Sequence, residues 1–336
     1  MEINKSIHIW LQISTVVLIL MIIVGGATRL TNSGLSIVHW KPITGVIPPL
    51  SLEQWEHSFN EYKNYPEFKL SNSEITLSNY KYIYYWEYLH RLLGRFIGFL
   101  FIIPFSFFLI KGYLNRKLIK QLLFIFLLGI IQGFIGWFMV KSGLVLNPYV
   151  SHYRLALHLI IAFFILSNIY KIKLSLMHQD ENKISNFSYY NNFIKIVLLI
   201  IYLQVIYGAF NAGLKTVNIY NTFPFFNNNI IPSDIFSMKP IWLNFFENNS
   251  FVQFIHRYLA VLVLILCSVF CFKINTTRNR INFNAQYLII LVLFQCMLGI
   301  LTLNAKAPII FSLTHQLLAS LLILTVIKIK HLLRFQ

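Results

Sequence analysis

Long apolar runs alternate with polar segments along this chain, and the runs have the length of membrane-spanning helices. A helix needs about 20 apolar residues to cross a bilayer. The runs are continuous rather than alternating, which favours helices over the strands of a closed barrel. We therefore expect an all-α polytopic membrane protein with eight transmembrane helices. They are residues 9–27, 89–110, 121–140, 155–170, 193–212, 251–272, 287–303 and 311–329.

Histidines recur at matching positions in the two halves of the chain. His90 is followed 68 residues later by His158, and His256 is followed 59 residues later by His315. Each stands near the start of an apolar run. We therefore expect all four within the first few residues of the outer helix ends, in one shallow layer.

A second mark recurs in the other helices, where a glutamine and a glycine stand four residues apart on one helical face. Met21 and Gly25 hold this place in the first helix, without the glutamine. Glycine permits close approach of a neighbouring helix or of a flat cofactor, and helix packing alone is the alternative. The pairs are Gln132 and Gly136, Gln204 and Gly208, and Gln295 and Gly299.

Both marks predict a duplication of a four-helix bundle. We expect tandem repeats at residues 1–175 and 193–336, joined by a cytoplasmic linker at 176–192. Four helices per repeat give both halves the same orientation, unlike the inverted repeats of many transporters.

The charge distribution indicates topology. The net charge is +17, with 57% hydrophobic residues and a mean hydropathy of +0.64. The segments on the side of both termini carry 15 of the 28 Lys and Arg but only 3 of the 11 Asp and Glu. Positive residues mark cytoplasmic loops. We expect an uncleaved first helix, a bacterial inner membrane location, both termini in the cytoplasm, lipid contact and no nucleic-acid partner.

Histidines in membrane segments are expensive and point to a ligand function. Neutral imidazole is a good iron ligand, and two histidines from facing helices can clamp a heme. Zinc would require three or four close ligands, with cysteine or carboxylate among them. We therefore predict that His90, His158, His256 and His315 bind two hemes in pairs. The other histidines lack this symmetry and are expected to be solvated or interfacial: His8, His39, His57, His152, His178 and His331.

Arginines near the outer helix ends suit heme propionates, because the guanidinium group pairs with carboxylates in a planar fork. Arg91 and Arg257 each follow a predicted ligand, and Arg154 lies near a third. We predict all three as cofactor-binding residues. Snorkelling to the membrane interface is the alternative.

A carboxylate distinguishes the two halves. Glu87 precedes His90 by three residues on the same helical face, whereas Gln253 stands at the equivalent place before His256. This asymmetry predicts that the first site performs chemistry and the second carries electrons. Glu87 would be the catalytic residue, exchanging protons or stabilising a cation. The alternative is an exposed glutamate favoured by the helix dipole at a helix start.

Two further features suggest how the rest of the chain is used. The outer connections at 28–85 and 215–250 are long, which is typical of functional covers. For the second, a tolerated surface insertion is the alternative. The cysteines lie inside predicted helices, where we expect them to pack rather than react: Cys267, Cys271 and Cys296.

Several motifs together resemble the heme A synthase family, in the form found in alphaproteobacteria and mitochondria. The resemblance spans nearly the whole chain. One departure is His39, where the family pattern suggests an acidic residue before Trp40. The motifs are GGATRLTNSGLS (25–36), WKPITG (40–45), EYLHRLLGR (87–95), QGFIGWFMVKSGL (132–144), YRLALHL (153–159), HRYLA (256–260) and THQLLA (314–319).

The resemblance implies an enzyme that oxidises the C8 methyl group of heme O to the formyl group of heme A, for cytochrome oxidase. It implies that His90 and His158 frame the substrate heme beside Glu87 as the catalytic acid residue. His256 and His315 would then hold a resident heme b.

The implied partners are the heme O synthase (a protoheme farnesyltransferase), which would deliver substrate, and the cytochrome oxidase assembly machinery. The electron donor, and whether the chain forms a homo-oligomer, stay open. The histidine pairs also suit a diheme b-type, quinol-linked electron-transfer cytochrome, although this alternative leaves the Glu87 asymmetry unexplained. A heme-binding transporter or assembly factor fits poorly, because all the ligands lie in one outer layer.

Overall fold

The computed structural model describes residues 2–41, 44–145, 150–177, 188–274 and 280–334. No β-strand occurs in these ranges, so the all-α prediction is confirmed. Contacts divide the chain into two compact units, Val16–His158 and a unit made of Met1–Thr15 with Leu159–Gln336. Most of the expected 176–192 linker, including His178, lies outside the described residues.

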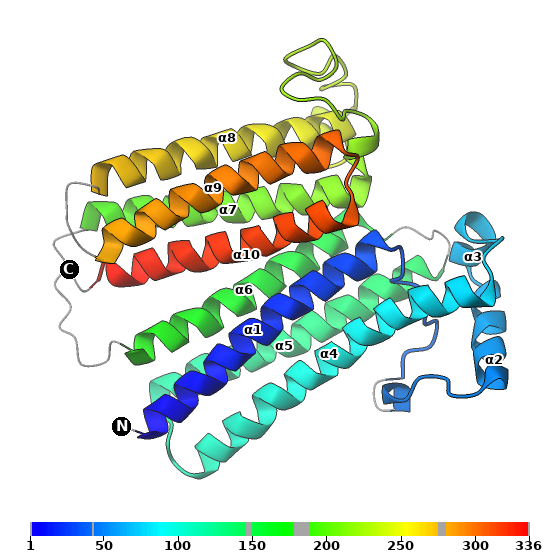
Figure 1. Cartoon of the computed structure of the whole chain (residues 1–336), viewed down its shortest axis with the longest axis horizontal. Helices are drawn as coiled ribbons and strands as arrows, with labels where there is room; N and C mark the ends of the chain where they lie inside the picture. Colours follow the sequence, from blue (N-terminus) through cyan, green and yellow to red (C-terminus); the bar gives the residue numbers. More distant parts are fainter. Residues whose placement is uncertain (1, 42–43, 146–149, 178–187, 275–279, 335–336) are drawn as a thin grey trace. The chain divides into compact units, whose positions relative to one another are not determined.

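Eight helices in the described ranges are long and apolar enough to cross a membrane (Figure 1). Their number agrees with the prediction, and the chain is a multi-pass membrane protein. They are α1 Glu2–Leu30, α4 Leu77–Ile110, α5 Arg116–Gly143, α6 His152–Met177, α7 Ser188–Leu214, α8 Asn249–Ile274, α9 Arg280–Asn304 and α10 Ile309–Leu332.

Helix α4 corrects one prediction. It begins at Leu77 rather than at residue 89, after an N-cap in which the Thr76 side chain accepts a hydrogen bond from the Asn79 amide. His90 therefore lies well inside its helix, and not within the first few residues. His158, His256 and His315 lie nearer the starts of their helices, as the seventh residue of α6, the eighth of α8 and the seventh of α10.

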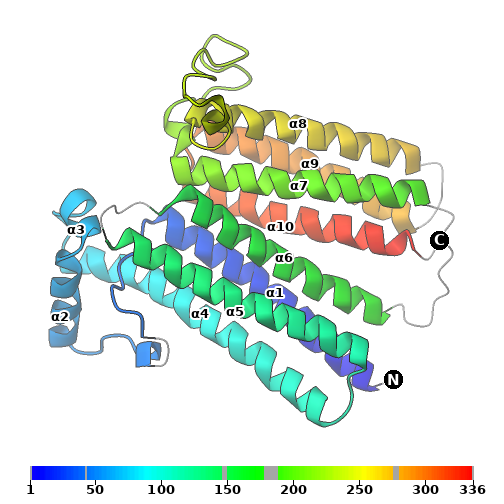
Figure 2. The same cartoon turned by 180° about the vertical axis from the view of Figure 1, so that it is seen from behind.

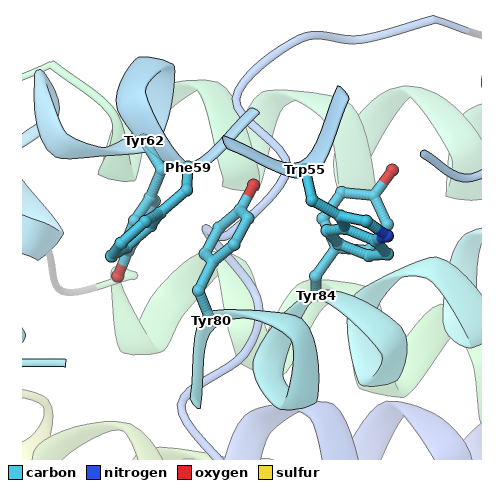
Figure 3. Packing of buried hydrophobic residues seen from close by; sticks show 5 residues of the cluster. All are labelled: Trp55, Phe59, Tyr62, Tyr80 and Tyr84. Atoms are coloured by element: carbon cyan, nitrogen blue, oxygen red, sulfur yellow. The ribbon is translucent and has the colours of Figure 1, made fainter. Parts of the chain in front are cut away.

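Two short helices that the hydropathy pattern does not reveal lie in the connection between α1 and α4. They are α2 Leu52–Lys63 and α3 Pro66–Ser71. A capping box between Ser51 and Gln54 starts α2. The buried face of α2 meets the first turns of α4 in an aromatic cluster (Figure 3). The cluster consists of Trp55, Phe59, Tyr62, Tyr80 and Tyr84.

In the other unit, α7 to α10 close into a four-helix bundle, since α8 contacts α7 and α9, and α10 contacts α9 and α7 (Figure 2). The connection before α8 contains two 3-10 turns, η2 Thr216–Asn218 and η3 Ile241–Phe245. Asn248 joins this connection to the start of α8. Its side-chain nitrogen donates to the Asp234 carbonyl at 2.8 Å, and its side-chain oxygen accepts from the Ser250 amide at 2.9 Å.

Candidate heme sites

Each of the four predicted histidines lies against the glycine of the preceding transmembrane helix. A Cβ added at Gly25 would be 3.2 Å from Nε2 of His90. A Cβ at Gly136 would be 3.1 Å from Cε1 of His158. The glycines therefore give room to the imidazole rings, and not only to neighbouring helix backbones.

The same contact recurs in the four-helix bundle of α7 to α10. A Cβ at Gly208 would be 3.1 Å from Cε1 of His256, and a Cβ at Gly299 would be 3.1 Å from Cε1 of His315. At these distances the ring would have to shift for any larger residue. The glycines of the sequence mark thus lie on the helical faces that meet the predicted histidines.

The glutamines of the same mark also face the histidines. Nε2 of Gln204 lies 3.5 Å from Nε2 of His256, and Nε2 of Gln295 lies 3.2 Å from Nε2 of His315. Gln132 differs, because its amide donates to the backbone carbonyl of His158 at 3.0 Å.

Several buried polar atoms around the histidines have no hydrogen-bond partner within the described part of the chain. They include Nδ1 of His158, His256 and His315 and the side-chain oxygens of Gln132, Gln204 and Gln295. Buried polar atoms without a partner are uncommon in folded proteins and require an explanation. Imidazole nitrogens left free in a glycine-lined space fit a ligand that takes a nitrogen lone pair, such as heme iron.

Each unit contains two of the four predicted histidines, His90 and His158 in one and His256 and His315 in the other. Across the described residues, no three His, Cys, Asp or Glu side chains converge to hold a metal ion. Pairs of histidines without further ligands fit axial ligation of heme better than a zinc site.

Glu87 is buried, with 2% of its surface exposed, so the alternative of an exposed helix-start glutamate is wrong. One carboxylate oxygen accepts from the Ser36 hydroxyl and from the Ile37 amide, both at 2.8 Å. The other accepts from Arg91, from Nε at 3.0 Å and from a terminal nitrogen at 2.5 Å. Ser36 ends the motif at 25–36, but nothing in the sequence links Ser36 or Ile37 to Glu87, because they lie some 50 residues before it.

Arg91 and Arg257, both predicted to bind propionates, differ in how many of their N–H groups already donate hydrogen bonds within the protein. Arg91 also donates to the carbonyls of Ile37 at 2.9 Å and His39 at 3.3 Å, so four of its five N–H groups are engaged. Arg257 donates to the carbonyls of Tyr220 and Phe225, yet its buried Nε has no partner within the described ranges.

The remaining predicted residues lie as follows. Arg154 covers the Phe138 ring, with its guanidinium carbon 4.2 Å from the ring centroid. His39 is exposed and pairs with Glu61 at 3.0 Å. His152 and His331 are buried, with 8% and 7% of their surfaces exposed, which corrects the expectation that they are solvated or interfacial.

The cysteines are unpaired thiols. Cys267 is buried, and Cys271 and Cys296 are partly buried. This agrees with the expectation that they pack inside helices.

Comparison with known proteins supports the heme interpretation. The chain is 42% identical over 325 residues to the heme A synthase of Wolbachia pipientis wMel, covering 95% of this chain and 90% of the relative. It is 40% identical over 338 residues to the heme A synthase of Nitrosospira multiformis, covering 99% and 95%. A family model described as cytochrome oxidase assembly protein, COX15-CtaA, matches residues 8–327. The chain therefore belongs to the COX15-CtaA family of cytochrome oxidase assembly proteins.

Proposed function

We propose that this protein is an oxidoreductase that converts heme O to heme A by oxidising the C8 methyl group to a formyl group. Two facts support the proposal. The first is the four glycine-lined histidines, of which His158, His256 and His315 have an imidazole nitrogen without a partner in the described residues. The second is the extensive identity with proteins named heme A synthase. The first carries the proposal, because two such histidines in each unit would suffice to ligate two hemes.

Within this proposal, His90 and His158 bind the iron of the substrate heme, and His256 and His315 hold a resident heme b. Heme b, when bound, supplies one-electron transfer. The two glycine cradles orient the rings, so that the substrate meets the protein in a fixed position.

A methyl C–H bond resists proton chemistry. The oxidation would therefore need an external oxidant, which accepts two electrons from the substrate carbon in each of two successive hydroxylations. Each hydroxylation replaces one C–H bond with a C–OH bond, and the resulting hydrated aldehyde loses water to give the formyl group. The protein contributes position and a closed site. Glu87, one turn before His90, is the carboxylate on which we expect the reaction at the substrate site to depend, and its burial supports a role there.

Arg257, whose buried Nε has no partner in the described residues, would pair with a propionate of heme b. Arg154, four residues before His158, would pair with a propionate of the substrate. Arg91 has one N–H left for the same purpose. The proposed setting is a bacterial inner membrane with both termini in the cytoplasm, where the heme O synthase delivers substrate and cytochrome oxidase assembly uses the product.

Extraction of the hemes from purified protein tests this function. The protein is expressed with and without a heme O supply, and its hemes are identified by chromatography and mass. We expect heme b in both cases, and heme O, hydroxylated heme O or heme A only with the supply. Two equivalents of heme b that the supply does not change would instead establish a diheme electron-transfer cytochrome.

A further inference from the structure

Residues 35–41, which we call the strap, run between α5 and α4 in the unit Val16–His158. Leu35 is 2% exposed and lies so close to α5 that a Cβ at Gly143 would be 2.8 Å from its Cδ2. Further along, the Trp40 ring lies 5.8 Å from the Trp137 ring of α5. Leu35 and Trp40, near the two ends of the strap, therefore both contact α5.

Between these contacts the strap is fastened to α4 by its backbone. Arg91 donates to the carbonyls of Ile37 and His39, and Arg95 donates to the carbonyl of Lys41 at 2.9 Å. Arg91 and Arg95 stand four residues apart on α4, about 6 Å along the helix axis, so together they hold the strap at two successive places.

The fastening lies at the level of the histidines. His90 stands between Glu87 and Arg91 on α4, and Trp137 follows Gly136, which contacts His158. A segment that joins these two places crosses beside the His90–His158 pair. It is thereby in a position to close that site.

Glu87 completes the fastening. Its carboxylate accepts four hydrogen bonds, two from the strap at Ser36 and Ile37 and two from Arg91. A carboxylate with its acceptor positions filled in this way has no open position for exchanging a proton with a substrate. It is well suited to hold two segments together, since hydrogen bonds to ionised groups are the strong ones.

The other unit uses the same positions for the same purpose. Gln253, three residues before His256, donates to the Tyr220 carbonyl at 2.8 Å and accepts from Arg257 at 3.3 Å. Arg257 also donates to the Phe225 carbonyl and covers the Phe226 ring at 4.0 Å. Both units therefore use equivalent positions. Glu87 and Arg91 around His90, and Gln253 and Arg257 around His256, bind the connection that precedes their own helix.

We infer that Glu87 and Arg91 are positioning residues, which fasten the strap across the outer side of the His90–His158 site and so hold that site closed around its occupant. This inference rests on the proposed function only for the identity of that occupant, heme O. It assigns Glu87 to closure of the site rather than to proton transfer.

Thiol labelling tests the fastening without substrate. Leu35→Cys serves as a reporter in full-length protein in lipid nanodiscs, with a bulky polar maleimide as the probe. The parent protein with its three native cysteines gives the baseline. We expect Glu87→Gln to raise the labelling rate about tenfold, because an amide cannot accept from both Arg91 and the Ile37 amide. Gln253→Ala, the matched change in the other unit, should leave the rate unchanged.

Ser36→Ala separates the two roles of Glu87, since it removes one strap contact and leaves the carboxylate in place. Positioning predicts faster exchange of the Ile37 amide hydrogen and a higher KM for heme O at unchanged kcat, both restored by Ser36→Thr. A labelling rate of Leu35→Cys that Glu87→Gln does not change would overturn the inference, as would a lower kcat in Ser36→Ala with unchanged exchange. Because labelling and exchange are measured without turnover, a failure of the proposed reaction would not be mistaken for a failure of the strap.

Discussion

The imidazole ring of His158 lies against Gly136, so closely that an added Cβ would be 3.1 Å from its Cε1. Contacts of the same kind join Gly208 to His256 and Gly299 to His315. The glycines limit where the rings can stand, so under the proposed function heme binding should depend on them as well as on the histidines.

Alanine at these glycines should displace the rings. We expect Gly208→Ala to reduce heme b occupancy about tenfold or more, because overpacking a tight site costs about 1–3 kcal/mol. Heme content per protein, measured by absorbance after extraction, reports the effect. Gly133→Ala is the control, since nothing lies within 4 Å of a Cβ there. Equal heme content in both variants would show that the close contact does not position the histidine.

Arg257 should tune the resident heme if it pairs with a propionate. Removing a positive charge favours the oxidised form, so Arg257→Gln should lower the midpoint potential of heme b. An interaction of about 1 kcal/mol corresponds to roughly 40 mV for one electron. Redox titration of the purified protein measures this shift. Arg257→Lys keeps the charge and should recover most of the potential, whereas a potential unchanged in Arg257→Gln would place the propionates elsewhere.

The hydropathy pattern predicted the eight membrane helices, because the backbone N–H and C=O groups of a spanning segment must form hydrogen bonds within one long apolar helix. It missed the first turns of α4, because polar and aromatic residues predominate between Leu77 and Glu87 and Tyr80 and Tyr84 pack in the aromatic cluster with α2. The glutamine and glycine spacing identified the faces that meet the histidines. The strap contacts were beyond reach, because backbone groups such as the Ile37 amide and the His39 carbonyl have no signature in a sequence.

Asn248 should hold the second outer connection in place. It caps α8 by accepting from the Ser250 and Phe251 amides, and it donates to the Asp234 carbonyl. Asn248→Ala should cost about 2 kcal/mol of local stability, because it removes a helix cap and leaves buried backbone groups without partners. Limited proteolysis between residues 219 and 247 should then be faster. Asn228→Ala, an exposed asparagine in the same connection, should leave the cleavage rate unchanged.

The stability of α2 and α3 should depend on pH through the carboxyl group of Glu67. It is 6% exposed, and burial raises the pKa of its carboxyl from 4.5 to about 7, while Tyr62 donates to it at 3.0 Å. Between these values the folded state holds more protons than the unfolded state. The stability present below pH 4.5 is therefore lost as the pH rises to about 7, by an amount on the order of 3 kcal/mol.

Glu67→Gln should remove this dependence, because a neutral amide can accept the Tyr62 hydrogen bond at every pH. Hydrogen exchange of the α2 and α3 amides at about pH 5 and about pH 8, on either side of the Glu67 titration, measures it. In the native protein, the exchange of these amides should increase from the lower to the higher pH by more than the intrinsic pH dependence of amide exchange. In Glu67→Gln, the increase should match the intrinsic dependence. Glu56→Gln, an exposed carboxylate on α2, should behave as the native protein does. The same pH response in Glu67→Gln and the native protein would mean that Glu67 does not become ionised in this range.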